Sequence, residues 1–446
     1  MSVITRFAPS PTGFIHIGNI RTALICYMVA KSQGGKFMLR LDDTDLERSK
    51  KEYADAIEED LAWLGLNVDL KAKQSERLSR YEEVKQQLID AGRLYPCFET
   101  PEEIEIKRKM LLSRGKPPIY DRSALSLTED QKQTFIDQGK PVHWRFKLDE
   151  KAVIEWDDLV KGNIRFEAKN LSDPVLIRAD GSPTYMLPSA IDDMDFAISH
   201  VVRGEDHVSN TAIQIQLFEA LGSHIPTFAH HSLMKGKDGK ISKRKGGFSI
   251  QDLRHEDHIE PMAILSMLAR LGTSEPIEIR HTLQEILDHF DITTFTKNTA
   301  IYEVEDLKKL NTKLIHELSF DQVKDRTELN NIDETFWLSV RGNIDTLADI
   351  QTWRKICQDS LDPIIDSQDK EFTQKASQLL PETPWNEETW TIWVNTLKDN
   401  TDRKGKSLFM PLRKALTAQD HGPELKYVLP LIGREKAIAR LNGTHA

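Results

Sequence analysis

The chain has 446 residues and a formal net charge of −10, and hydrophobic residues make up 39% of it. This length predicts three to five domains, and the hydrophobic fraction is sufficient for buried cores. No segment approaches the roughly 18 apolar residues of a membrane-spanning helix, and the first residues lack the features of a secretory signal. Three widely spaced cysteines, Cys26, Cys97 and Cys357, do not make a disulfide framework. We therefore expect a cytoplasmic protein without membrane contacts.

The first predicted elements are a strand over residues 3–7 and a helix over residues 17–31, separated by two prolines and a glycine. The strand is β-prone, and apolar residues recur at helical spacing along the helix. His16 and Gly18 therefore fall at the start of the helix, where backbone N–H groups and the helix dipole favour a bound phosphate. Gly18 would let a nucleotide approach the backbone. A histidine in this position more often caps the helix or packs against it.

An acidic cluster follows the next predicted strand, over residues 36–41. Ligands of open α/β sheets bind just beyond the carboxyl ends of the strands, so Asp42 is a candidate for ligand binding. The alternative is helix capping, in which Thr44 or Asp45 begins the next helix. We expect capping for Asp45 rather than for Asp42.

The sequence changes character between about residues 96 and 185. A charged helical stretch over 101–114, a proline-rich link and β-like segments such as 142–148 replace the alternation of strands and helices, and a turn at 180–183 leads back to it. This pattern predicts an insertion between two halves of a nucleotide-binding fold.

A basic segment follows the insertion, Gly239-Lys240-Ile241-Ser242-Lys243-Arg244-Lys245. A cluster of this kind is usually a solvated loop. Together with the turn at His16, however, it supplies what attack at the α-phosphate of ATP requires, namely N–H donors at a helix N-terminus and a lysine from a second loop. The two motifs in this order are much more specific than either motif alone.

The rest of the chain is predicted to be mainly helical, with a helix over 261–271 and a helical region beyond about residue 310. Five of the eight tryptophans lie in that region, namely Trp337, Trp353, Trp385, Trp390 and Trp393. Core packing is the more common role of such residues, and stacking on unpaired nucleotide bases is the functional alternative for one or two of them.

The two motifs resemble the HIGH and KMSKS signatures of class I aminoacyl-tRNA synthetases, here His16-Ile17-Gly18-Asn19 and Lys240-Ile241-Ser242-Lys243-Arg244. Three further segments resemble the glutamyl-tRNA synthetases, namely Arg6-Phe7-Ala8-Pro9-Ser10-Pro11-Thr12-Gly13, Leu41-Asp42-Asp43-Thr44-Asp45 and Val202-Arg203-Gly204-Glu205-Asp206-His207. The resemblance covers effectively the whole chain. It implies an α/β Rossmann-type class I catalytic core with an α+β acceptor-binding insertion, followed by an all-α C-terminal anticodon-binding region.

The resemblance also implies a division of the chain into six segments. The two catalytic halves span 1–95 and 186–254, the second with the lysine signature loop, and they flank the insertion at 96–185, which would bind the acceptor end of tRNA. A connector at 255–310 would contact the tRNA stem. Two helical anticodon-binding subdomains would follow at 311–372 and 373–446.

The implied activity is that of a glutamate–tRNA ligase. The α-carboxylate of L-glutamate attacks the α-phosphate of ATP, with Mg²⁺ present, to give glutamyl-adenylate and diphosphate. The glutamyl group then passes to the 3′-terminal adenosine of tRNA(Glu), and the sequence leaves open whether tRNA(Gln) is charged as well. We expect a monomer that acts mainly by positioning the reactants and stabilising charge on the phosphates.

Residues at matching positions acquire roles from the resemblance. His16 and Lys243, with Lys240 as a weaker candidate, would stabilise charge on the phosphates during catalysis. ATP would be bound by His16 and Lys243 and by four further residues, Gly18, Asn19, Asp206 and His207.

Arg6 and Arg203 match the positions that hold the side-chain carboxylate of glutamate, and a guanidinium group suits a carboxylate geometrically. For Arg203 the alternative is an ion pair with the neighbouring Glu205 or Asp206.

Three more residues, Ser10, Tyr185 and Asp42, match substrate-binding positions. Many members of the family have glutamate at the position of Asp42, in contact with the amino group of the substrate. The aspartate keeps the charge but is one methylene shorter. Ser189 stands where some members have asparagine, and its role stays open.

Some bacterial members carry a zinc knuckle in the insertion, with a C-x-C pair and a later C-x-H pair. In this chain the first part is Cys97-Phe98-Glu99 and the later part is Ser123-Ala124-Leu125. One thiol does not make a tetrahedral structural zinc site. We therefore expect no zinc.

One alternative lies within the same superfamily, and a second belongs to another class of function. A glutaminyl-tRNA synthetase of the eukaryotic type would have β-barrels at its C-terminus, where this chain is predicted to be helical. A catalytically inactive paralogue that binds tRNA is disfavoured because His16, Lys243, Arg6 and Arg203 are all present.

Overall fold

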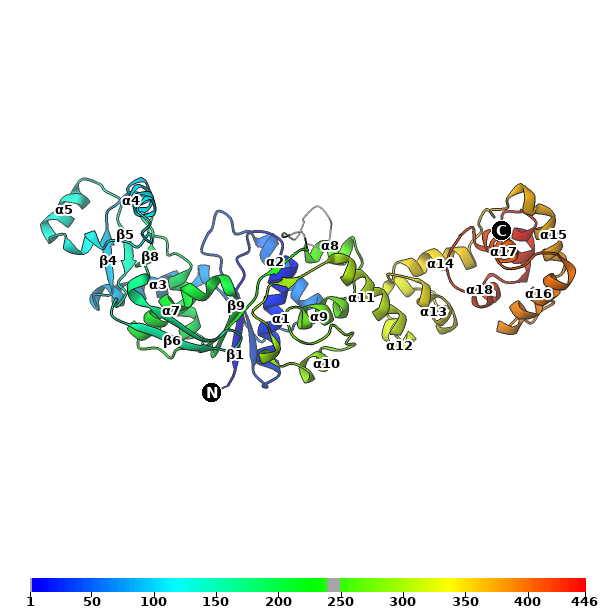
Figure 1. The fold of residues 1–446 in the computed structure, drawn as a ribbon, viewed down its shortest axis with the longest axis horizontal. Coiled ribbons are helices and arrows are strands. Elements are labelled where there is room, and N and C mark those ends of the chain that lie inside the picture. Colours follow the sequence, from blue (N-terminus) through cyan, green and yellow to red (C-terminus); the bar gives the residue numbers. More distant parts are fainter. Residues whose placement is uncertain (1, 238, 240–248) are drawn as a thin grey trace. The chain divides into compact units, whose positions relative to one another are not determined.

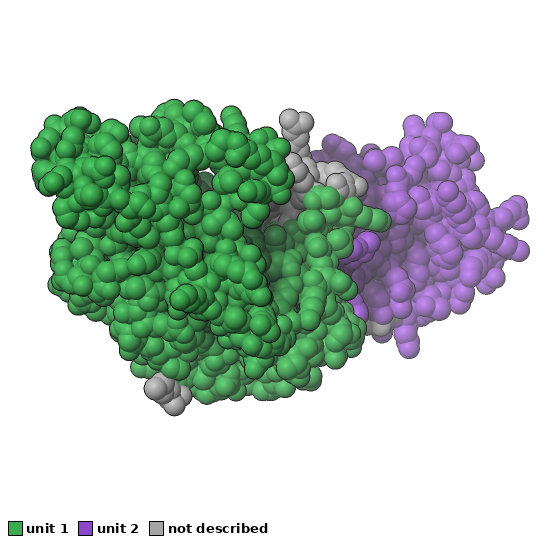
Figure 2. All heavy atoms as spheres, turned by 60° about the vertical axis from the view of Figure 1, so that its left-hand side comes forward, with its two compact units in different colours: residues 1–257, 264–304 green, residues 258–263, 305–446 purple. Residues whose placement is uncertain are grey.

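The structure is a computed structural model that describes residues 2–237, 239 and 249–446, so Lys240 and Lys243 lie outside the described residues. The chain forms two compact units. Unit 1 comprises Met1–Asp257 and Ile264–Val304, and unit 2 comprises His258–Ala263 and Glu305–Ala446 (Figures 1 and 2).

Unit 1 is built on a five-stranded parallel sheet with the strand order β10-β9-β1-β2-β3. Its strands are β1 (Ile4–Phe7), β2 (Lys36–Leu41), β3 (Leu70–Lys73), β9 (His200–Gly204) and β10 (Thr227–His231). The chain leaves β1 toward β2 on one side and later returns to β9 on the other. The strand order therefore switches between β1 and β9, which is where open α/β sheets bind ligands.

Helix α1 (Ile17–Lys31) packs against β1, β2 and β9 and lies near the middle of the unit (Figure 1). It is buried on nearly all sides, from Ile17 to Ala30, as expected for a helix that is apolar around its circumference. The strands predicted over 3–7 and 36–41 and the helix predicted over 17–31 are confirmed.

Other helices of unit 1 are α2 (Lys51–Trp63), α3 (Leu78–Asp90), α6 (Met186–Asp195), α7 (Val208–Ala220), α8 (Ile250–His255) and α10 (Leu283–Asp288). The prediction that Thr44 or Asp45 begins α2 is wrong, because α2 begins at Lys51. Asp45 instead accepts a hydrogen bond from the backbone N–H of Arg48 at 3.2 Å, in a separate turn. That turn contributes to the wall of a cleft described below.

The insertion is an α+β structure, as predicted. One antiparallel sheet has the order β4-β5-β8, and a separate hairpin joins β6 to β7. Its elements are β4 (Leu94–Cys97), α4 (Pro101–Ser113), α5 (Glu129–Asp137), β5 (His143–Phe146), β6 (Val153–Asp158), β7 (Gly162–Glu167) and β8 (Val175–Ile177). Two short parallel strands, β11 (Met234–Lys235) and β12 (Ala300–Ile301), lie elsewhere in unit 1.

Described secondary structure in unit 2 is helical, as predicted. Helix α9 (Pro261–Arg270), within one residue of the predicted helix, begins in unit 2 and continues into unit 1. The other helices of this region are α11 (Val304–Glu317), α12 (Phe320–Val323), α13 (Glu334–Val340), α14 (Asp349–Gln358), α15 (Lys370–Gln378), α16 (Glu387–Asn400), α17 (Lys406–Thr417), α18 (Leu425–Ile432) and α19 (Arg434–Leu441).

The tryptophans of unit 2 belong mainly to its core. Trp337 and Trp393 are completely buried, and Trp353 is nearly so. Trp385 and Trp390 are partly buried and pack against the same core. Core packing is therefore the observed role, and unpaired bases have no access to Trp337 or Trp393.

We expect Trp393→Ala to destabilise unit 2 by about 3–5 kcal/mol, because it empties a fully buried aromatic site. It also removes the indole donor to the carbonyl of Ala376, at 3.0 Å. Ile392→Ala is the matched control, since Ile392 is the preceding residue of α16 and is 55% exposed. Urea unfolding followed by circular dichroism measures both; equal midpoints for the two variants would contradict the assignment.

Candidate active site

A cleft of about 1370 Å³ opens at the carboxyl ends of the parallel strands of unit 1. All predicted site residues that the structure describes line it, namely Arg6, Ser10, His16, Gly18, Asn19, Asp42, Tyr185, Arg203, Asp206 and His207. These residues come from segments far apart in sequence. The parallel sheet brings them together because its strands all end at the same edge.

His16 is the N-cap residue of α1, as the capping alternative predicted. Its Nδ1 accepts hydrogen bonds from the backbone N–H groups of Gly18 at 3.1 Å and Asn19 at 3.3 Å. The side chain of Asn19 accepts in return from the backbone of His16 at 3.2 Å. Since Nδ1 is an acceptor here, the proton of a neutral ring lies on Nε2. Capping is thus compatible with donation from Nε2 to an anion in the cleft.

The absence of a side chain at Gly18 leaves space for the imidazole ring of His16. A Cβ atom at this position would lie 3.0 Å from both Cε1 and Nδ1 of His16, which is closer than side chains normally approach. A larger residue would therefore displace the ring from the helix N-terminus.

The described residues on either side of the basic segment, which contains Lys240 and Lys243, lie at this site. Gly239 lines the cleft, and Ser249 forms an isolated antiparallel bridge with His16. The backbone N–H of Ile250 donates to the carbonyl of Ile15 at 3.2 Å. The described residues on either side of Lys240 and Lys243 are thus next to the cleft and to the helix cap.

Arg6 is held in the cleft by a buried carboxylate that sequence analysis missed. Its Nε and Nη2 donate to the two oxygens of Asp193 on α6, at 2.9 and 3.2 Å. Nη1 of Arg40, on β2, donates to the same carboxylate at 2.7 Å. Burial acts to raise the pKa of Asp193, but the two guanidinium groups outweigh it and hold this pKa below its usual range. Nη1 of Arg6 takes part in neither of its two bonds to Asp193.

Arg203, on β9, is buried but is held by neutral groups. Its Nη2 donates to Oγ1 of Thr211 at 2.6 Å and to Oε1 of Gln214 at 2.7 Å, and its Nε donates to Nε2 of His230 at 3.3 Å. Burial, reinforced by the positive charge of Arg6, lowers the pKa of Arg203 to about 10. Its Nη1 takes part in none of these bonds.

The predicted alternative for Arg203 is wrong. Glu205 pairs with Lys161, and in the part of the chain that the structure describes Arg203 forms no ion pair with a carboxylate. A buried guanidinium group without a carboxylate partner is costly. The arrangement therefore suits a site that receives an anionic ligand.

Asp42 lines the cleft but is also bound by Arg40. Arg40 donates from Nε to Oδ1 of Asp42 at 2.7 Å and from Nη2 to Oδ2 at 3.1 Å. Burial raises the pKa of Asp42, although Arg40 opposes the shift. Arg40 also donates to Oγ of the buried Ser189 at 3.1 Å. Ser189 therefore has at least a structural role in orienting Arg40.

Tyr185, Asp206 and His207 form one wall of the cleft. The rings of Tyr185 and His207 meet edge to face with centroids 6.1 Å apart, and His207 Nε2 lies 3.7 Å from Oδ2 of Asp206. Burial, followed by the charge of Arg203, lowers the pKa of His207. A neutral imidazole beside an exposed tyrosine offers a polar, partly aromatic surface to a ligand.

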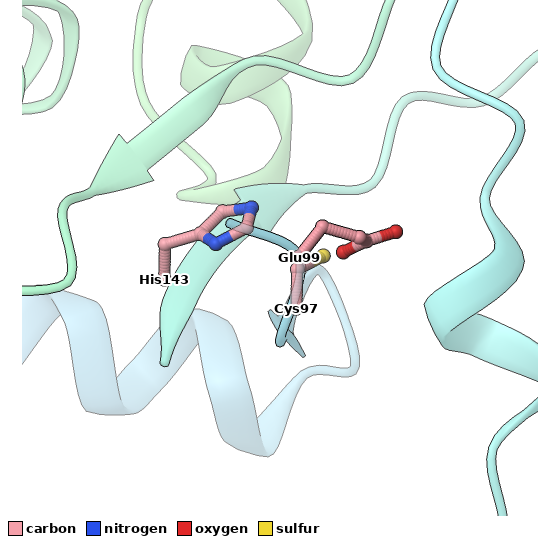
Figure 3. Close-up of side chains that lie close together, drawn as sticks. All are labelled: Cys97, Glu99 and His143. Atoms are coloured by element: carbon pink, nitrogen blue, oxygen red, sulfur yellow. The ribbon is translucent and has the colours of Figure 1, made fainter. Parts of the chain in front are cut away.

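One group of three possible metal ligands occurs among the described residues, Cys97, Glu99 and His143, with ligand atoms within 4.8 Å of one another (Figure 3). Cys97 lies on β4 and His143 on the neighbouring strand β5. Sequence analysis missed His143 because the pairing of the two strands, not sequence spacing, brings it near the thiol. Nε2 of His143 and Oε2 of Glu99 are buried without a hydrogen-bond partner.

These side chains do not fit a closed zinc site, which requires four ligands. The Tyr120 hydroxyl contacts Cys97 Sγ at 3.6 Å and donates to Glu99 Oε1 at 2.8 Å. Lys107 already places an ammonium group 3.4 Å from the same Glu99 oxygen. Burial raises the pKa of Cys97 to about 11, which disfavours the thiolate that zinc binds.

We expect the purified protein to contain no stoichiometric zinc, and a zinc-selective chelator to leave its circular dichroism spectrum unchanged. Elemental analysis after dialysis measures the metal content. His143→Ala is the companion variant. One zinc per chain in the native protein that is lost in this variant would contradict the prediction.

Two family patterns match the chain. The pattern described as tRNA synthetases class I (E and Q), catalytic domain, matches residues 2–312, and that described as anticodon binding domain matches residues 338–444. The sequence is 54% identical over 442 residues to glutamate–tRNA ligase 1 of Rickettsia bellii (strain OSU 85-389), covering 98% of this chain and 99% of that protein. It is 50% identical to glutamate–tRNA ligase 2 of Ehrlichia canis (strain Jake), covering 99% of each.

The fold is similar to a crystal structure of a glutamate tRNA ligase from Elizabethkingia meningosepticum CCUG26117 in complex with its amino acid. The TM-score is 0.85 at 27% sequence identity, with 99% of each chain covered. The parallel sheet, the cleft at its carboxyl edge and the helical unit 2 are thus the architecture of the class I tRNA synthetases. Within that class, the chain belongs to the glutamate–tRNA ligase family.

Among the residues described, no helix combines the length and apolar character needed to cross a membrane.

Proposed function

We propose that this chain catalyses the reaction of its family, the activation of L-glutamate with ATP and its transfer to the 3′-terminal adenosine of tRNA(Glu). The observation that carries the proposal is the pair of buried guanidinium groups of Arg6 and Arg203, which both line the cleft. Each is held by hydrogen bonds to protein through Nε and Nη2. Each keeps Nη1 for a substrate carboxylate, which a guanidinium group binds well.

The phosphates of ATP would lie at the N-terminus of α1. Backbone N–H groups and the helix dipole favour them there, and Nε2 of His16 would donate to a phosphate oxygen. Lys243, with Lys240 as the weaker candidate, would stabilise the negative charge that develops on the phosphates during attack at the α-phosphate. Mg²⁺ would neutralise charge on the phosphates. Gly18, Asn19, Asp206 and His207 would line the nucleotide site.

The remaining substrate contacts would come from Ser10, Tyr185 and Asp42, all at the cleft. Asp42 would face the amino group of glutamate while Arg40 orients it. The six segments inferred from the sequence remain part of the proposal, with residues 96–185 binding the acceptor end and residues 311–446 the anticodon. We also propose that the protein is a cytoplasmic monomer, with tRNA(Gln) as a second acceptor to be tested by charging both tRNAs.

The glutaminyl-tRNA synthetase alternative is less well supported. Glutamine carries a neutral amide, which would leave the charge of Arg203 without an anionic partner. A catalytically inactive paralogue that binds tRNA is disfavoured because His16, Arg6 and Arg203 all line one cleft.

Replacing Lys243 by alanine should lower adenylate formation by at least about a hundredfold, while the Kd values for ATP and glutamate stay near those of the native protein. The reason is that its charge would act on the transition state rather than on the bound substrates. Pyrophosphate exchange with tRNA present measures the rate. Lys36→Ala is the control, since Lys36 is exposed at the opposite, amino end of β2. Native turnover with only a raised KM for ATP would refute the assignment.

Replacing Arg203 by alanine should weaken glutamate binding by about 10- to 150-fold, because a hydrogen bond to a charged group contributes about 1.5–3 kcal/mol. ATP binding should change little. His16→Ala is the comparison, and we expect it to affect turnover much more than glutamate affinity. An unchanged glutamate Kd in Arg203→Ala would assign Arg203 a structural role only.

A further inference from the structure

We propose that Asp158 and His230 are positioning residues for glutamate binding: the Asp158 carboxylate holds the His230 imidazole in the tautomer that accepts a hydrogen bond from Arg203, and so orients the guanidinium group toward the substrate. This inference deepens the proposed function and rests on the role assigned to Arg203. Neither Asp158 nor His230 lines the cleft.

The three side chains form a buried line of hydrogen bonds. Nδ1 of His230 lies 2.5 Å from Oδ2 of Asp158, and Nε2 of His230 accepts from Nε of Arg203 at 3.3 Å. Asp158 and His230 have fully buried side chains. The chain of contacts thus runs from the end of β6, through β10, to the substrate-facing residue on β9.

The tautomer of His230 follows from what its neighbours can donate. The guanidinium group of Arg203 has donors only, so the bond from its Nε requires an unprotonated Nε2 on His230. The proton of a neutral ring then lies on Nδ1 and is donated to Asp158. Oγ1 of Thr211, 2.8 Å from Nε2, accepts from Arg203 and is able to donate its own proton to the ring.

The buried position of His230 and the positive charges near it favour its neutral form. Burial is the largest influence, and Arg203 and Lys161 add to it, so the pKa of His230 lies below its ordinary value although Asp158 opposes the shift. The charge of a protonated His230 would also act on two neighbouring imidazoles, those of His207 and His231, and it helps to lower the pKa of each. A neutral His230 can accept from Arg203, whereas a protonated ring cannot.

Asp158 is itself rigidly placed. Its Oδ1 accepts from the backbone N–H groups of Val160, Lys161 and His230, at 3.1, 2.9 and 3.1 Å. Oδ2 is thereby aimed at the imidazole. The same turn carries Lys161, which pairs with Glu205 directly after β9. The β6–β7 hairpin of the insertion is therefore anchored at two points beside the glutamate-binding strand.

This geometry makes Asp158→Asn a specific test. The amide oxygen should take the place of Oδ1, which receives three backbone N–H groups, and the amide NH₂ should then face Nδ1 of His230. The proton of the ring would then lie on Nε2, which could no longer accept the hydrogen bond from Nε of Arg203. We expect the KM for glutamate to rise at least tenfold and the KM for ATP to stay within about twofold. Asp157→Asn, on the exposed face of the same strand, is the control.

Two substitutions of His230 separate positioning from packing. The amide of glutamine can reach the position of Nε2 and accept from Arg203, whereas the amide of asparagine reaches only the position of Nδ1. We therefore expect His230→Gln to keep the glutamate KM within about threefold of the native value, and His230→Asn to raise it at least tenfold. Thermal unfolding of both variants reports any common loss of stability.

Nitrogen NMR of histidine-labelled protein gives a readout that does not depend on activity, with the His230 signals identified by their absence from His230→Gln. The native protein should show the Nδ1–H tautomer and Asp158→Asn the Nε2–H tautomer. An Nε2–H tautomer in the native protein, or equal glutamate KM values in His230→Gln and His230→Asn, would overturn the proposal. If Arg203→Ala itself left glutamate binding intact, the proposed function of Arg203 would fail instead.

Discussion

The site depends on the hydrogen bonds and ion pairs that hold buried arginine side chains in the cleft of unit 1. Arg6 and Arg40 both donate to the carboxylate of Asp193, and Arg40 also donates to Asp42, while Arg203 donates to neutral groups. Removing one partner of such a buried pair typically costs about 3–5 kcal/mol, so Asp193 is essential for the two arginines beside it. Arg203 has no carboxylate partner among the described residues, and a bound substrate carboxylate would supply one.

The second constraint is that the parallel sheet and α1 together have to position two substrates, glutamate and ATP. The parallel sheet places the arginines on β1 and β9, on either side of the switch point, and α1 starts between them at the His16 cap. A carboxylate at the arginines and phosphates at the helix N-terminus would therefore lie in the same cleft. In the proposed reaction, catalysis would come from alignment of the reactants and stabilisation of charge, without a covalent intermediate on the protein. Asp158 and Lys161 do not line the cleft themselves, but they anchor the hairpin of the insertion to β10 and to the turn after β9.

Much of this arrangement could be predicted from the sequence. Apolar patterning located the first two strands and α1, and motif spacing led to residues that the sheet gathers in one cleft. The start of α2 was predicted wrongly, because capping residues such as Asp45 also stabilise turns. The partners of Arg6 and Arg203 were missed for another reason. Asp193, Asp158 and His230 become neighbours of these arginines only through tertiary packing, and an acidic residue on a helix usually faces solvent. His143 was missed because strand pairing, not sequence spacing, brings it to Cys97.

Selection between glutamate and glutamine tests the central role of the buried arginines most directly. Charging of tRNA(Glu) should be measured with each amino acid at saturating ATP, and the two values of kcat/KM compared. We expect glutamate to be preferred by at least about a thousandfold, because glutamine leaves a desolvated guanidinium group without its anionic partner. Equal charging with the two amino acids, or a preference for glutamine, would contradict the assignment of Arg6 and Arg203 as the carboxylate-binding pair.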